Sequence, residues 1–132
     1  MKITADTNVL VRAITEDDGR QSQAAQSELR NATVVALTLT ALCELVWVLS
    51  RGYRIPSLDI AATIRRLMDS EKVVMDRPAA EAGLALLQAG GDFADGVIAH
   101  EGRWLGADTF VSFDQRAVML MEAQGERARL LP

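Results

Sequence analysis

Short apolar strands alternate with helical segments along the whole chain, and this alternation constrains the fold more than any other feature. The expected strands, several of them rich in β-branched residues, span 2–5, 34–37, 72–75, 109–113 and 128–131. The expected helices span about 7–14, 22–30, 41–51, 58–68, 78–89, 93–103 and 115–122. Strands that alternate with helices in this way predict an α/β protein with a mostly parallel sheet.

Length and composition indicate one folded domain. The chain has 132 residues, of which 49% are hydrophobic and 24% charged, and we expect a single domain over residues 1–132. No run reaches the roughly 18 apolar residues of a membrane span, so no membrane association is expected. Asp6 and Asn8 interrupt the apolar N-terminus, which therefore lacks the pattern of a signal peptide, and the expected location is the cytoplasm.

Charge and cysteine content narrow the possible partners. The formal net charge of −4 does not attract polyanions over the whole surface. A nucleic-acid partner would need a local cause, either divalent cations bound in an acidic pocket or arginines gathered on one rim. The single cysteine, Cys43, excludes an intramolecular disulfide and a multi-cysteine zinc site. It lies in an apolar helical run, where we expect it to be buried.

Polar residues in front of three expected helices predict their N-caps. Thr40 and Ser57 precede apolar helical runs, and Asp92 follows a glycine pair with Asp95 three residues later, as in a capping box. Helical spacing also predicts which side chains form the core stripe of the helix that ends near Gly52. These residues are Leu42, Leu45, Val46 and Leu49.

Four carboxylates fall where parallel α/β folds bind their ligands. Asp6 and Asp114 each follow an expected strand, whereas Glu44 and Asp95 lie near the starts of helices. Strand carboxyl ends and helix N-termini share one face of such a fold, so we expect these side chains in one crevice. Taken singly, Asp6 or Asp114 could be a helix cap and Asp95 could complement a helix dipole. Glu44 is harder to explain structurally because apolar residues flank it on both sides.

Carboxylates gathered in one crevice indicate a bound cation. They repel one another, and a metal ion between them relieves the repulsion. Oxygen ligands without histidine or cysteine favour Mg²⁺ or Mn²⁺ over zinc. Two such ions about 3.5–4 Å apart can activate water and stabilise both oxygens of a phosphodiester displacement. The negative net charge therefore does not exclude a nuclease.

The four acidic motifs, taken in order, resemble the PIN domain family. They are hydrophobic-Asp-Thr-Asn at Asp6, the apolar helix with Glu44, DFADGVIA with Asp95, and FVSFDQRA with Asp114. Their order and the chain length are similar to the VapC-type toxins of bacterial type II toxin–antitoxin pairs. The resemblance implies a three-layer α/β/α fold whose mostly parallel central sheet has about four to five strands. It also implies an endoribonuclease that depends on Mg²⁺ or Mn²⁺, with these four residues as catalytic groups and metal ligands.

Matching positions assign supporting roles to further residues. Asn8 and Ser112 would orient carboxylates or water, with backbone capping as the alternative for both. Asp92 would be an extra acidic contributor or simply an N-cap. Arg116, directly after the Asp114–Gln115 pair, is the first candidate for a phosphate contact.

Other polar and aromatic residues favour structural explanations. Solvated helix surfaces are the expectation for the remaining arginines near the motifs, which are Arg12, Arg51, Arg54 and Arg77. His100 is favoured as a structural histidine over a general base. Trp47 could stack on a base but is favoured as a core or interface residue, and Trp104 lies at a helix end.

The resemblance also implies partners. A VapB-type antitoxin would insert a segment, commonly with an arginine, at the acidic pocket, and a homodimer or a hetero-oligomer with the antitoxin is expected. The helices on either side of Gly52 could present an apolar groove to it.

Two alternatives remain. One is a catalytically silent PIN-like module that binds RNA or protein, which intact carboxylates at all four positions disfavour. The other is a phosphatase with an aspartyl nucleophile. Such enzymes carry Asp-x-Asp after the first strand and a late lysine, but here the second position is Asn8 and the last lysine is Lys72.

Overall fold

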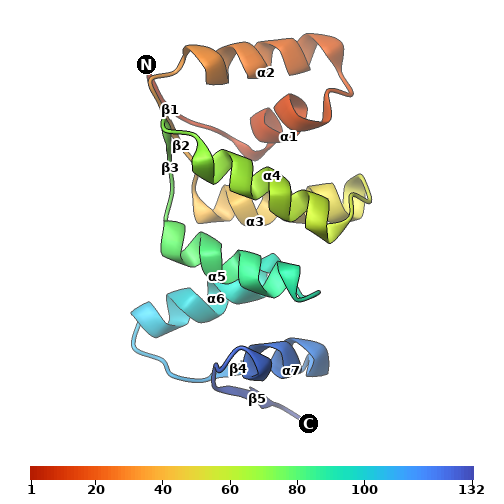
Figure 1. Ribbon diagram of the computed structural model, residues 1–132, viewed down its shortest axis with the longest axis vertical. Coiled ribbons are helices and arrows are strands. Elements are labelled where there is room, and N and C mark those ends of the chain that lie inside the picture. Colours follow the sequence, from red (N-terminus) through yellow and green to blue (C-terminus); the bar gives the residue numbers. More distant parts are fainter. The chain divides into compact units, whose positions relative to one another are not determined.

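Parallel strands and helices alternate in the computed structural model, which describes residues 1–132 (Figure 1). The chain divides into two compact units, Met1–Asp76 and Arg77–Pro132. The first contains β1 (Lys2–Thr4), α1 (Thr7–Thr15), α2 (Gly19–Asn31), β2 (Val34–Ala36), α3 (Leu39–Trp47), the π-helix η1 (Val48–Gly52), α4 (Ser57–Asp69) and β3 (Val73–Val74). The second contains α5 (Arg77–Gln88), α6 (Phe93–Trp104), β4 (Phe110–Ser112), α7 (Gln115–Ala123) and β5 (Ala128–Leu130).

Every strand pair is parallel, which confirms the predicted α/β class. In the first unit the strand order is β1-β2-β3, with Ile3 opposite Val35 and Val35 opposite Val73. In the second unit β4 pairs with β5, and Val111 lies opposite Arg129. The five expected strands are all present, but they are only two or three residues long and belong to one sheet of three strands and one of two.

The core of the first unit follows the predicted helical stripes. All four stripe residues of α3 and η1 are buried, as are Ile60, Ile64 and Met68 of α4. Each fully buried Leu or Ile side chain contributes roughly 1.5–3 kcal/mol to folding, so this stripe fixes α3 onto the sheet. None of the helices is long and apolar enough to cross a membrane.

The same stripe explains why two side chains are less buried than a core residue. Cys43 is half-buried, so the prediction that it is buried is wrong. Trp47 is 62% exposed, so of its two predicted roles, core or interface residue, the core role is wrong. Both lie on α3 outside the arc of positions that the stripe occupies, and a helix buries one side only. Leu45 and Leu49 are fully buried in the core, so neither can line the predicted apolar groove near Gly52.

Three helix starts differ from the predicted ones. Thr38, and not Thr40, caps α3, because its hydroxyl accepts the Ala41 amide at 3.1 Å. Ser57 is the first residue of α4, with Pro56 at the N-cap position. Helix α2 begins at Gly19, three residues before the expected start, because the preceding Asp18 supplies a side-chain cap.

Asp92 caps α6 as predicted, and its carboxylate accepts the Ala94 amide at 3.2 Å. The reciprocal half of a capping box is missing, since the carboxylate of Asp95 accepts no hydrogen bond from the Asp92 amide. The charge of Asp95 is therefore not used in capping the helix.

Glycines allow α5 and α6 of the second unit to approach closely. A Cβ on Gly96 would clash with the carbonyl group of Ala82, and a Cβ on Gly83 would lie 2.7 Å from the ring of Phe93. Phe93 and Gly83 are both buried. The two glycines thus fix the distance between the two helices and with it the position of the first turn of α6.

A polar cluster ties the α1–α2 connection to the segment after η1. The Tyr53 hydroxyl donates to Asp17 Oδ2 at 2.6 Å, and Arg12 and the Thr15 hydroxyl donate to Asp17 Oδ1 at 2.9 and 3.0 Å. The hydrogen bond from Tyr53 is the main reason that the pKa of Asp17 lies below its ordinary value of 3.8. Ionised Asp17 therefore holds two separate segments together.

Replacing Tyr53 with phenylalanine is expected to reduce stability at neutral pH but not at strongly acidic pH. The folded-state pKa of Asp17 is depressed, so its contribution is complete above the unfolded value near 3.8 and disappears as the pH falls through the lower folded value. Thermal melting of wild type and Tyr53→Phe between pH 7 and pH 2 tests this. A constant difference in Tm over the whole range would contradict it.

Candidate active site

Asp6 lies in the short connection that follows the carboxyl end of β1, directly before the first residue of α1. It occupies the N-cap position, and its backbone carbonyl accepts the amides of Val9 and Leu10. Its side chain makes no capping hydrogen bond and is exposed. The Asp6 carboxylate therefore does not cap α1, contrary to the alternative role considered for it, and it is available to a ligand.

Glu44 shares this part of the first unit with the start of α1. The Thr7 hydroxyl donates to Glu44 Oε1 at 3.2 Å. Thr7 adjoins Asp6 in the chain, so one hydroxyl places the second carboxylate beside the segment that carries the first. Glu44 is exposed on α3 opposite the buried stripe, because positions 42, 45, 46 and 49 face the core.

Three carboxylates influence one another in the second unit. Asp95 is half-buried in the first turn of α6, and burial is the largest cause of its raised pKa. The negative charges of Asp92 and then of Asp114 raise the pKa further. A carboxyl group surrounded by like charges is destabilised when ionised, and a bound cation would reverse the effect.

Asp114 is held in place by backbone contacts at the start of α7. Its Oδ1 accepts the amides of Arg116 and Ala117 at 3.0 and 3.2 Å. Its own amide donates to the Ser112 hydroxyl at 3.0 Å. Asp114 therefore caps α7, which is the alternative role that the sequence allowed for it. Ser112 orients the backbone of Asp114.

The other two predicted supporting residues behave differently. Arg116 donates from Nε to the Gly90 carbonyl at 3.2 Å, and Gly90 has a φ of +96°. This hydrogen bond joins α7 to the turn that precedes Asp92, so Arg116 helps to hold the segments that carry Asp92 and Asp114. The Arg116 side chain is otherwise exposed. Asn8 makes no hydrogen bond to a carboxylate and lines a groove of about 310 Å³ between α1 and α2.

The carboxylates supply a ligand set of oxygen atoms only. Neither unit by itself contains a group of three or more His, Cys, Asp or Glu side chains that could hold a metal ion. The donor chemistry nevertheless fits a hard divalent cation, because Asp92, Asp95 and Asp114 concentrate negative charge and no histidine or cysteine accompanies them. These residues therefore suit Mg²⁺ or Mn²⁺ better than zinc.

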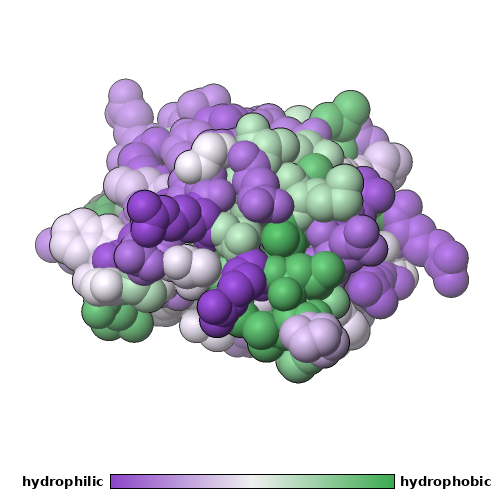
Figure 2. Space-filling model, turned by 90° about the horizontal axis from the view of Figure 1, so that it is seen from below, coloured by the Kyte–Doolittle hydropathy of each residue, from purple (hydrophilic) through white to green (hydrophobic).

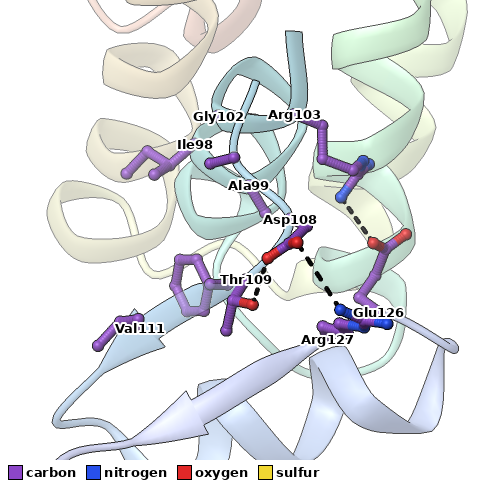
Figure 3. A pocket seen from close by; sticks show the side chains of 11 residues that line it. Ile98, Ala99, Gly102, Arg103, Asp108, Thr109, Val111, Glu126 and Arg127 are labelled. Carbon is purple, nitrogen blue, oxygen red and sulfur yellow. Dashed lines mark hydrogen bonds and ion pairs between the residues drawn. The ribbon is translucent and has the colours of Figure 1, made fainter. Parts of the chain in front are cut away.

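The recess between α6, β4 and β5 is not this site. It encloses about 200 Å³ and lies at the amino ends of β4 and β5, whereas Asp114 follows the carboxyl end of β4 (Figure 3). Its charges are already paired, Arg103 with Glu126 at 2.7 Å and Arg127 with Asp108 at 3.7 Å. The recess offers no free charge to a phosphate or a metal.

The sequence pattern of the PIN domain family matches residues 3–120. The chain belongs to the PIN domain family. The match spans both compact units and includes all four motif carboxylates. PIN domains are generally nucleases, so the family supports a hydrolase of nucleic acids, and PIN domains typically use divalent metals. No curated protein matches the chain.

Two features of this PIN domain escaped prediction from its sequence. The hydrogen bond between Thr7 and Glu44 joins residues 37 positions apart, and only the Asp-Thr-Asn motif itself hinted at it. The pairing of Arg12 with Asp17 at 2.9 Å was also unexpected. His100 is half-buried, and its Nε2 is buried without a hydrogen-bond partner.

Proposed function

We propose that this PIN domain is a Mg²⁺- or Mn²⁺-dependent endoribonuclease and the toxin of a VapBC-type toxin–antitoxin pair. The observation that carries the proposal is the carboxyl group of Asp95, whose ionised form is disfavoured by burial and by Asp92 and Asp114. Family membership supplies the reaction class, since PIN domains are generally nucleases. RNA as the substrate, the metal and the toxin role are proposals that rest on the sequence motifs.

In this proposal, four carboxylates bind the metal and neighbouring polar groups orient them. Asp6, Glu44, Asp95 and Asp114 would hold the metal, which would lower the pKa of a bound water and neutralise charge on the phosphodiester. The Thr7 hydroxyl orients Glu44, and Ser112 with the α7 amides orients Asp114. Asp114 and Asp92 each use one carboxylate oxygen for capping, which leaves the other oxygen of each free to face a ligand.

Exposed apolar side chains of the second unit support a protein partner such as a VapB-type antitoxin. A soluble monomer seldom exposes a large contiguous apolar patch. Figure 2 shows one group of hydrophobic residues beside hydrophilic ones, with further hydrophobic residues elsewhere on the same face. The exposed large apolar residues of this unit are Ile98, Trp104, Leu105, Val111, Phe113, Met119 and Leu130.

Removal of divalent metal is expected to abolish RNA cleavage. Purified protein in excess EDTA should cut a labelled single-stranded RNA at least about a hundred-fold more slowly than in Mg²⁺, because the metal supplies both the activated water and the charge stabilisation. Added Mg²⁺ or Mn²⁺ should restore the rate. Equal cleavage in EDTA by folded protein would refute the metal mechanism.

The toxin role has a separate test in living cells. Induced expression in bacteria should arrest growth, and Asp6→Asn should relieve the arrest because it removes a proposed metal ligand. The variant should still fold, because the Asp6 side chain makes no capping hydrogen bond to α1. Equal amounts of the two folded proteins are checked by immunoblot. Normal growth of cells that contain active wild-type protein would refute the toxin role and leave the ribonuclease activity intact.

A further inference from the structure

The exposed side of α3 continues past Glu44 with an aromatic residue and two arginines. Glu44, Trp47 and Arg51 recur at spacings of three and four, which puts them on one side of a helix. All three are exposed, whereas the residues between them that face the core are buried. Because Trp47 is 62% exposed, most of the apolar surface of its indole is in contact with water and packs against no other residue.

Arg51 and Arg54 of this segment are among the arginines of the chain whose side chains are unpaired. Several arginines are bonded to protein groups, namely Arg12, Arg66, Arg103, Arg116 and Arg127. Arg51 and Arg54 are exposed and make neither an ion pair nor a side-chain hydrogen bond. Two free guanidinium groups three residues apart are suited to phosphates, which they can contact by paired hydrogen bonds.

The backbone of this segment is both fixed and strained. The π-helix η1 is closed by the Tyr53 amide, which donates to the Val48 carbonyl, and the Ile55 amide donates to the Leu49 carbonyl. Arg54 has a φ of 53°, a left-handed conformation that costs a non-glycine residue free energy. Strained positions and π-helical turns are enriched at functional sites. Nothing in the packing requires an arginine there, since its side chain is exposed.

We propose that Trp47, Arg51 and Arg54 form a binding surface for single-stranded RNA that leads to Glu44. Trp47 stacks on a base, and the two arginines bind successive phosphates of the strand. At a rise of about 1.5 Å per residue, the helix from Glu44 to Arg51 spans roughly 10 Å, which is a reach of one to two nucleotides. The inference rests on the proposed ribonuclease function and adds the residues that position the substrate.

Tryptophan fluorescence tests the stacking, because Trp47 and Trp104 are the only tryptophans and both are exposed. A short single-stranded RNA is titrated in Ca²⁺, in place of Mg²⁺, so that it stays intact. Emission of the Trp104→Phe variant, which retains Trp47, should be quenched, whereas that of Trp47→Phe should not. Trp47→Ala should bind about ten-fold more weakly, with much of the affinity kept in Trp47→Phe. Quenching of Trp104 alone would overturn the proposal.

Salt dependence tests the arginines. The slope of log K against log salt should fall by about 0.7 in magnitude for Arg51→Ala and again for Arg54→Gly, the amount expected for one phosphate contact to a single strand. Arg54→Gly should melt no lower than wild type, because glycine adopts a positive φ without strain. The matched control is Arg30→Ala, an exposed arginine in the last turn of α2, which should leave the slope unchanged.

The outcomes separate this surface from the proposed function. If the wild type cuts RNA but the Trp47 and arginine variants bind RNA with unchanged affinity and unchanged salt slope, the proposed RNA-binding surface is wrong and the proposed ribonuclease function stands. Loss of self-association in Trp47→Ala without any loss of RNA affinity assigns the surface to a second copy of the chain and also overturns it. Wild type that neither binds nor cuts RNA refutes both. DNA of the same sequence shows whether the surface favours RNA.

Discussion

Asp95→Asn is expected to slow RNA cleavage by about a hundred-fold or more while raising the melting temperature at neutral pH. The loss of activity follows because one carboxylate of the proposed metal site becomes neutral, and single groups that stabilise transition-state charge are worth factors of this size. The gain in stability follows because ionised Asp95 is half-buried beside Asp92 and Asp114. Asparagine keeps the shape of the side chain and removes the repulsion.

The sign of the stability effect follows from the pKa. The folded-state pKa of Asp95 is raised above its ordinary value of 3.8, so the folded protein binds this proton more tightly than the unfolded chain does. Stability therefore declines as the pH rises through the folded value, and Asp95→Asn avoids that decline. The two proteins should melt alike at low pH and diverge toward neutral pH. A lower Tm for Asp95→Asn at pH 7 would contradict this.

A control variant and the effect of Mg²⁺ on the melting temperature test this prediction further. Asp108→Asn removes an exposed carboxylate of the same unit, whose pairing with Arg127 at 3.7 Å is solvent-screened, and should change neither cleavage nor Tm. Mg²⁺ should raise the Tm of wild type more than that of Asp95→Asn, because a ligand stabilises the state that binds it. Equal shifts would mean that Asp95 is not a metal ligand.

The order of the elements could be predicted because local patterns determine it. Apolar residues at helical spacing and short β-branched runs locate every helix and strand of the chain within a few residues. The cap of α3 was misplaced because Thr38 and Thr40 are equally good caps on sequence grounds. Only the backbone at the end of β2 decides between them, by leaving Thr38 extended and within reach of the Ala41 amide.

The sequence shows where the candidate carboxylates lie along the chain and indicates Ser112 as a support of Asp114, but it does not show the long-range contacts that support the other residues. Asp6, Asp95 and Asp114 could be located because each lies at the boundary of a strand or a helix, and such boundaries are visible in the sequence. The contacts of Thr7 with Glu44 and of Arg116 with Gly90 join distant segments, so they depend on how helices pack. The core role of Trp47, one of the two that the sequence favoured, is wrong because its position on α3 lies outside the buried stripe.

Gly96→Ala is expected to be strongly destabilising even though alanine favours helices. A Cβ at position 96 would clash with the Ala82 carbonyl and lie 2.8 Å from the Gly83 Cα, and both are backbone atoms that cannot rotate away. Helices α5 and α6 must separate to relieve the clash, at a cost of about 2 kcal/mol or more, which corresponds to a fall in Tm of about 8 °C.

Gly102→Ala is the matched control in the same helix. A Cβ at position 102 meets no atom within 4 Å, so the change gains only helix propensity and should raise stability by roughly 0.5–1 kcal/mol. Thermal melting of the two variants compares packing with propensity directly. Because Gly96 adjoins Asp95, separation of the helices also displaces the first turn of α6, so Gly96→Ala should bind Mg²⁺ more weakly well below its melting temperature. Wild-type stability in Gly96→Ala would show that α5 and α6 do not approach so closely.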